Sequence, residues 1–197
     1  MSYYLPASDT VYIHIPKTAG SSVSNWIKKN LNYEYEGRQH DFYRHWVKNH
    51  RVPAHHFVTV RNPYARMFSW FHYQGRLIND KILQGEPLLE CEEKNLEIYS
   101  KGFAHWIAMD DRPWFYKDIK RQQIQYFDRD TAIKVHIENF NNDFVKVQEL
   151  VNCFDPIGVD NVSPASQLDY REYYDKKAKS FVDKLYANDL DYLGYTF

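Results

Sequence analysis

The first segment whose residues could do chemistry is the run HIPKTAGSS, from His14 to Ser22. It lies between a short apolar run and a segment with helical spacing, so its small residues predict a turn that opens a helix. Main-chain N–H groups and the positive end of the helix dipole attract an anion at such a turn. Lys17 adds a full positive charge. Hydroxyl donors come from Thr18, Ser21 and Ser22. An ordinary strand–helix turn explains the segment equally well when it is taken alone.

A second segment of this kind is VRNPYARMFS, residues 60–69. Arg61 follows another apolar run, at the strand end where open α/β sheets bind ligands. Asn62 and Pro63 then provide the cap and first residue of a helix, and Ser69 lies about two turns into it. An arginine binds phosphate in a bidentate manner, and a serine hydroxyl can complete the site. When this segment is taken alone, it is equally reasonable that Arg61 caps the edge of the sheet and that Ser69 is a surface residue of the helix.

The elements that position these segments alternate along the chain. Apolar, β-branched runs predict strands over residues 11–15, 56–60 and 132–137. Apolar spacing predicts helices over residues 22–31, 41–49, 62–77, 88–99, 102–109, 119–126, 141–153 and 173–188. This alternation favours an α/β fold with a parallel sheet covered on both faces. Because no repeat or linker interrupts the pattern, we expect residues 1–197 to form a single domain.

Charge and composition narrow the function classes. The formal net charge is -1, yet residues 38–76 hold seven Lys or Arg and a single acid. A local basic block in a neutral protein favours a small anionic ligand over a nucleic acid. The sequence shows no membrane span or secretory leader. The two cysteines, Cys91 and Cys153, fit no metal or disulfide pattern, so we expect a soluble cytoplasmic protein.

Together, PKTAGSS and VRNPYARMFS, about forty residues apart, resemble the two signature segments of sulfotransferases that use 3′-phosphoadenosine-5′-phosphosulfate (PAPS). They are most similar to the branch that contains heparan sulfate 2-O-sulfotransferase and bacterial relatives. The resemblance implies a P-loop-like three-layer fold, with a central parallel sheet flanked by helices. It implies that Arg61 and Ser69 hold the 3′-phosphate of the donor. The residues that it assigns to the phosphosulfate are Lys17, Thr18, Ala19, Gly20, Ser21 and Ser22.

Weaker similarities to the same family extend towards the C-terminus. They lie in Gln123–Phe127, in Val135–Phe140 and in Tyr186–Tyr195. The resemblance therefore spans nearly the whole chain, but it is specific only in the two phosphate segments.

Sulfuryl transfer needs positioning and charge stabilisation more than covalent catalysis. An acceptor hydroxyl attacks sulfur in line, and Lys17 is the natural stabiliser of the departing oxygen. A histidine base would activate the hydroxyl. The histidines between the two segments are His40, His45, His50, His55 and His56. We choose His40, because the heparan 2-O-type enzymes have their catalytic histidine at a similar distance before the arginine, with His45 next. The spacing of these histidines does not suit a metal site.

The resemblance implies PAPS as sulfuryl donor, its product PAP (3′,5′-ADP), and no metal. It also implies a small-molecule or glycan acceptor. Carbohydrate or a small alcohol is expected, and aromatic residues such as Trp70 and Trp106 either stack on it or pack in the core. Two alternatives stay open. One is a P-loop-type nucleotide kinase, although the lysine precedes the glycine and the GxxxxGK[ST] spacing is absent. The other is a non-catalytic nucleotide-binding protein of the same fold.

Overall fold

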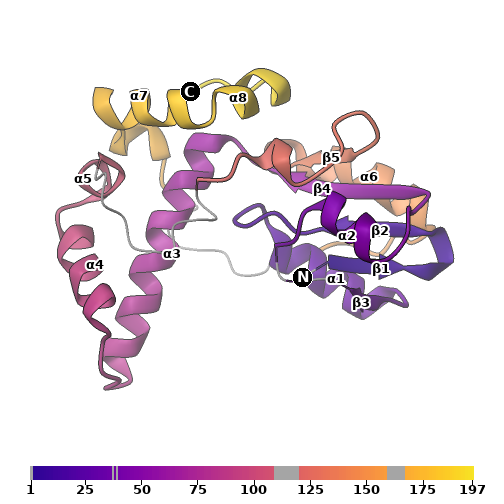
Figure 1. Cartoon of the computed structure of the whole chain (residues 1–197), viewed down its shortest axis with the longest axis horizontal. Coiled ribbons are helices and arrows are strands. Elements are labelled where there is room, and N and C mark those ends of the chain that lie inside the picture. Colours follow the sequence, from indigo (N-terminus) through magenta and orange to yellow (C-terminus); the bar gives the residue numbers. More distant parts are fainter. Residues whose placement is uncertain (1, 37, 39, 109–119, 159–166) are drawn as a thin grey trace. The chain divides into compact units, whose positions relative to one another are not determined.

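The computed structural model describes residues 2–36, 38, 40–108, 120–158 and 167–197 (Figure 1). The chain forms two compact units. The first consists of Met1–Arg61 and Gln123–Val162, and the second of Asn62–Gln122 and Ser163–Phe197. The boundary between Arg61 and Asn62 therefore falls inside the second phosphate segment.

The first unit contains a five-stranded sheet in the order β3-β1-β2-β4-β5 (Figure 1). Its strands are β1 (Ser2–Leu5), β2 (Thr10–Ile13), β3 (Glu34–Glu36), β4 (His55–Val60) and β5 (Ile133–His136). The three predicted strands are β2, β4 and β5, and they pair in parallel. β1 and β3 were not predicted. β1 pairs antiparallel with β2, and β3 pairs antiparallel with β1 at the edge of the sheet. The α/β fold with a parallel centre is thus confirmed, and the whole sheet is mixed.

Helices cover both faces of this sheet. They are α1 (Gly20–Asn30), α2 (Tyr43–Asn49) and α6 (Phe140–Val151). Successive side chains of a strand point to opposite faces. Tyr3 packs in one core cluster with Trp26 of α1 and Phe144 of α6. On the other face, the ring of Tyr4 stacks on Trp46 of α2, with 5.9 Å between centroids. The first unit is therefore three-layered, as expected.

The second unit is helical in the residues that the structure describes. Its helices are α3 (Pro63–Leu83), α4 (Glu90–Ser100), α5 (Phe103–Ala108), α7 (Lys176–Leu185) and α8 (Ala187–Leu193). The Asn62 side chain caps α3 by accepting from Tyr64 N–H at 3.0 Å. Trp70 and Trp106, considered for stacking on an acceptor, are buried in the aromatic core of this unit. Their rings therefore contribute packing energy.

Two predicted helices differ from those observed. Over the described part of residues 119–126 there is only a short 3₁₀ turn, Gln123–Gln125, because the Gln123 side chain is bonded to main-chain atoms of Arg61. The helix predicted over 173–188 is broken at Tyr186, between α7 and α8. Tyr186 is buried in the core of the second unit, so packing overrides the regular apolar spacing there.

His56 gives the first unit a pH-dependent stability. It is 1% exposed and stacks on Tyr43 of α2 with 3.9 Å between ring centroids. Burial lowers its pKa to about 4, compared with an ordinary value of about 6.5. Below pH 6.5 the unfolded chain therefore binds a proton that the native chain does not. We expect His56 to reduce the free energy of unfolding by about 1.4 kcal/mol per pH unit between pH ~6 and pH ~4.

Urea unfolding at a series of pH values tests this expectation with His56→Phe as the matched variant. Phenylalanine keeps the ring stacked on Tyr43 but cannot bind a proton. The variant should lose less stability than the wild type as the pH falls from 6 to 4.5. Parallel stability curves for the two proteins would show that His56 is not the group responsible.

Candidate active site

The carboxyl ends of the three parallel strands form one edge of the sheet. In the pairing register, Ile13 lies opposite Val58, and Val60 lies opposite His136. The loop after β2 and Arg61 after β4 therefore meet at this edge, which is where open α/β sheets bind ligands. Both belong to the first unit, whereas Ser69 lies half-buried in α3 of the second unit.

The loop between β2 and α1 has an unusual backbone. Lys17 has a φ of 67° and Ala19 a φ of 61°. Residues other than glycine rarely adopt this left-handed conformation, which costs roughly 1–3 kcal/mol and persists only where the surrounding structure holds it, as it often does at active sites. Ala19 is the N-cap of α1, and its methyl group cannot accept a hydrogen bond from the first turn. A loop built in this way suits an anion that binds to the helix N-terminus.

Thr18 holds the loop against the sheet. Its buried hydroxyl donates to the Ile15 carbonyl at 2.8 Å and lies 2.9 Å from the hydroxyl of Thr59 in β4. The single hydroxyl proton is therefore committed to Ile15, and the expected hydroxyl donor to an anion is not available at Thr18. Thr18 could instead donate to an anion through its main-chain N–H. Of the two serines that follow Gly20, Ser21 is exposed and Ser22 is buried.

The main chain of Arg61 is held by Gln123. Arg61 N–H donates to Gln123 Oε1 at 2.9 Å, and Gln123 Nε2 donates to the Arg61 carbonyl at 2.8 Å. Gln123 is fully buried, so this pair of bonds is shielded from water and holds the main chain of Arg61 directly after β4. From the sequence, Gln123 stands out only as part of the weak family similarity at Gln123–Phe127. Its partner lies 62 residues away, which no local pattern reveals.

His40 lies beside the loop. Its Nδ1 is 3.3 Å from the carbonyl oxygen of His14, and the two imidazoles meet edge to face with 4.8 Å between centroids. Its φ of 58° is again left-handed. Because a carbonyl oxygen can only accept, Nδ1 carries the proton in this hydrogen bond and the lone pair of the neutral ring is on Nε2. This is the tautomer that a base acting through Nε2 needs.

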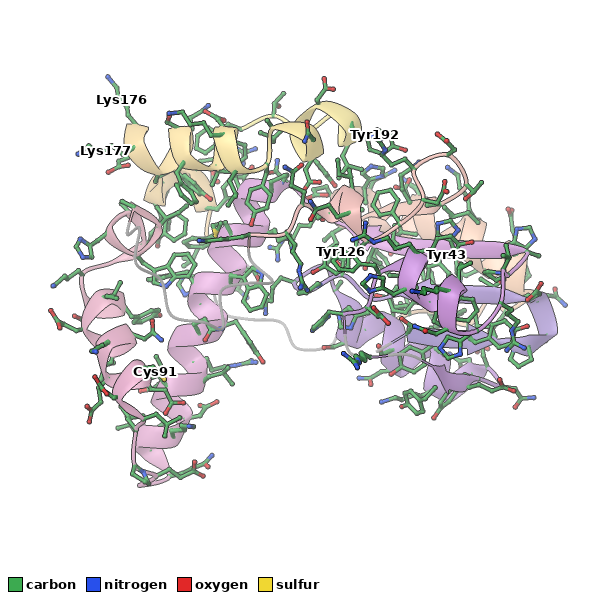
Figure 2. The ribbon with its side chains drawn as sticks, in the orientation of Figure 1. Tyr43, Cys91, Tyr126, Lys176, Lys177 and Tyr192 are labelled. Carbon is green, nitrogen blue, oxygen red and sulfur yellow. The ribbon has the colours of Figure 1, made fainter. Side chains whose placement is uncertain are left out.

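The segment that follows His40 is anchored on the same unit. The main-chain N–H of Tyr43 donates to the carbonyl of Tyr126 at 2.8 Å. Both residues are labelled in Figure 2. The rings of Phe42 and Tyr126 also contact each other, at 4.8 Å between centroids. These contacts fix the start of α2 and so restrict the chain that carries His40.

The other candidate histidines have different surroundings. His45 is about half-exposed on α2, and its Nδ1 lies 3.1 Å from Asp41 Oδ1. His50 stacks on Trp46 at 5.2 Å, and His55 is exposed at the opposite end of β4. His40, in contrast, contacts the loop through the carbonyl of His14, so it is the candidate that we place beside the loop.

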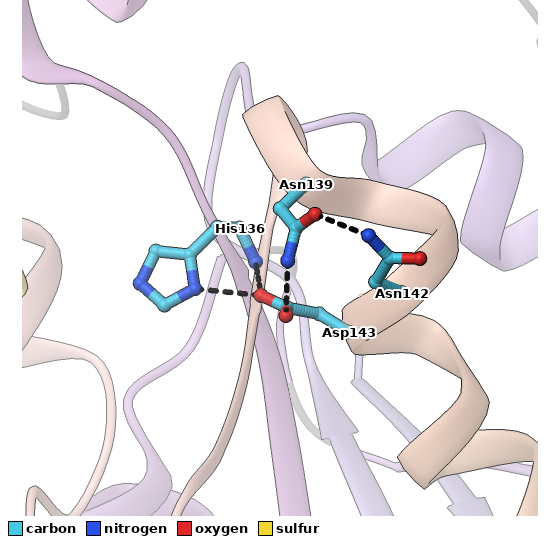
Figure 3. A network of polar contacts seen from close by, with 4 residues as sticks. All are labelled: His136, Asn139, Asn142 and Asp143. Atoms are coloured by element: carbon cyan, nitrogen blue, oxygen red, sulfur yellow. Dashed lines mark hydrogen bonds and ion pairs between the residues drawn. The ribbon is translucent and has the colours of Figure 1, made fainter.

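Asp143 of α6 is a further polar group near the sheet edge, and it was not predicted from the sequence. Asp143 Oδ2 accepts from the His136 main-chain N–H at 2.9 Å and from His136 Nδ1 at 2.7 Å, while Asn139 donates to Oδ1 (Figure 3). Partial burial would raise the pKa of Asp143, but these hydrogen bonds hold it below its usual value. Since β5 is two strands from β2, the backbone of His136 lies about 10 Å from β2 across the sheet. It is therefore badly placed to act at a group bound in the loop.

The sequence profile of the sulfotransferase family matches residues 4–196. The chain belongs to the sulfotransferase family. The match spans both units and thus nearly the whole chain. Comparisons with curated proteins and with solved structures give no significant match.

For this sulfotransferase, family membership implies sulfuryl transfer from a donor of the PAPS type to an acceptor. The loop before α1, with its two left-handed residues, and Arg61 at the sheet edge are consistent with that activity. Within the described ranges, no helix combines the length and apolar character needed to cross a bilayer.

Proposed function

We propose that this sulfotransferase moves the sulfuryl group of PAPS to a hydroxyl of a small-molecule or glycan acceptor and releases PAP. The observation that carries the proposal is the meeting of three features at one sheet edge: the left-handed loop before α1, His40 against that loop, and Arg61 after β4. The two free cysteines, Cys91 and Cys153, fit a reducing compartment, and we place the protein in the cytoplasm.

The features of the loop fit the phosphosulfate. An anion there would receive main-chain N–H donors from the start of α1 and the charge of Lys17. Arg61, whose main chain is held by Gln123, supplies a guanidinium suited to the 3′-phosphate. The family resemblance adds Ser69 to that phosphate, and we keep this assignment as part of the proposal.

The reaction then follows in-line displacement. The acceptor oxygen forms a bond to sulfur while the bond from sulfur to the 5′-phosphate oxygen breaks. The acceptor proton passes to His40 Nε2, since Nδ1 already carries a proton. Negative charge grows on the departing oxygen, and Lys17 stabilises it more in the transition state than in the ground state. No step needs a metal ion.

Nucleotide binding tests the donor. PAP at 100 times its Kd should stabilise the protein by about 2.7 kcal/mol without added metal, which gives a visible rise in Tm. A rise in Tm with Mg²⁺-ATP but none with PAP would favour the kinase alternative. Sulfation of a panel of glycans and small alcohols with radiolabelled PAPS would then identify the acceptor. A protein that binds PAP but transfers no label to any acceptor would support the non-catalytic alternative.

A further inference from the structure

The glycine of the loop is required by a neighbouring side chain and not by its own backbone. Gly20 does not have a positive φ, so a residue with a side chain could adopt its backbone conformation. A Cβ at this position, however, would lie 1.7 Å from Nε2 of His14 and 2.0 Å from its Cδ2. Since a helical Cβ tilts towards the helix N-terminus, Nε2 of His14 lies on the N-terminal side of Gly20, the first residue of α1.

His14 is an uncharged group in this position. Burial is the main cause that lowers its pKa to about 3, and the nearby charges of His40 and Lys17 lower it further. The carbonyl of His14 accepts the hydrogen bond from His40. Among the residues that the structure describes, the His14 ring lies against Gly20, Tyr12 and His40 and forms no hydrogen bond. A neutral imidazole always has one N–H to donate.

We propose that His14 is an anion-site residue whose Nε2–H donates a hydrogen bond to the 5′-phosphate end of the nucleotide bound at the start of α1. The inference rests on the proposed function. It adds His14, to which the sequence assigned no role, to the residues that bind the nucleotide. A neutral donor suits this place, because it binds phosphate oxygens without adding to the positive charge of Lys17. A neutral imidazole beside a helix N-terminus can act as a hydrogen-bond donor in this way.

Two substitutions separate hydrogen bonding from packing. His14→Phe keeps a planar ring beside His40 but has no donor, whereas His14→Gln places an amide N–H close to the position of Nε2. Calorimetry with PAP and with 3′-AMP, which lacks the 5′-phosphate, measures the contact. We expect His14→Phe to weaken PAP binding about 10-fold or more, as for a lost hydrogen bond to a charged group. His14→Gln should stay within about threefold of the wild type, and 3′-AMP should bind all three proteins equally.

The outcomes distinguish this inference from the function on which it rests. A wild type that does not bind PAP overturns the proposed donor, and the inference with it. A wild type that binds PAP overturns the inference alone if His14→Phe leaves PAP affinity unchanged, or if it weakens PAP and 3′-AMP to the same extent.

A second measurement needs no stable phenylalanine variant. Imidazole ¹H–¹⁵N spectra of the wild type, with the His14 signals assigned by their loss in His14→Gln, report on the ring itself. The His14 signals should show a protonated Nε2 and should shift with PAP but not with 3′-AMP. Signals that do not move at saturating PAP, or that move equally with both nucleotides, overturn the proposal.

Discussion

Replacement of His40 by asparagine should lower kcat by roughly 10²–10⁴ and leave PAP affinity nearly unchanged. The side chain would lose the base that accepts the acceptor proton, while the donor nucleotide keeps its contacts with the loop and with Arg61. Asparagine is the suitable substitution because His40 has a φ of 58°, and asparagine tolerates the left-handed conformation better than alanine does. Steady-state kinetics with radiolabelled PAPS, together with PAP calorimetry, measures both quantities.

His45→Asn is the matched control, since His45 is exposed and paired with Asp41 on α2. It should change neither kcat nor PAP affinity. A His40→Asn protein that melts earlier but turns over normally would show that His40 only packs against the loop. Loss of turnover in His45→Asn with normal turnover in His40→Asn would move the base to His45.

Replacement of Arg61 should mainly weaken nucleotide binding, whereas replacement of Lys17 should mainly slow sulfuryl transfer. Arg61→Ala is expected to weaken PAP binding about 10- to 100-fold, because a charge-assisted hydrogen bond to phosphate contributes about 1.5–3 kcal/mol. The substitution removes only the side chain, so the bonds between Gln123 and the Arg61 main chain can persist. Lys17→Ala should instead lower kcat more than it weakens PAP, because the charge that Lys17 stabilises grows in the transition state.

PAP calorimetry and single-turnover transfer rates on both variants test this division. 3′-AMP and 5′-AMP locate each contact, since Arg61→Ala should weaken 3′-AMP and spare 5′-AMP. Equal loss of PAP binding in the two variants, with no additional effect of Lys17→Ala on the rate, would contradict the assigned roles.

The sequence was sufficient to predict those elements whose signal lies within a short segment of the chain. The order of β2, loop, α1, then β4 and α3, could be predicted because each element carries its own pattern. Apolar runs mark the strands, small residues mark the loop, and Asn62 with Pro63 marks the start of α3. The two phosphate segments were also sufficient to predict the family, which the match over residues 4–196 confirms.

Contacts between distant residues decided the rest of the fold. β1 pairs antiparallel with β2, β3 pairs antiparallel with β1, and these short segments become strands through pairing with their neighbours. The turn at Gln123 has its partner in Arg61, and the break at Tyr186 follows from burial of that ring. Apolar spacing alone predicted helix at both places, because spacing carries no information about the partner.

The same limit applies to the site. The sequence by itself determined which residue types are present: a lysine, hydroxyl groups, an arginine and several histidines near a small-residue turn that opens a helix. Only the tertiary structure brought His40 to the carbonyl of His14, 26 residues earlier, and put the ring of His14 over Gly20. It also turned the Thr18 hydroxyl inwards, to Ile15 and to Thr59, which is 41 residues later. The contacts of His40 with His14 and of Thr18 with Thr59 join residues far apart in the sequence and form only when the sheet has assembled, so spacing along the chain could not assign them.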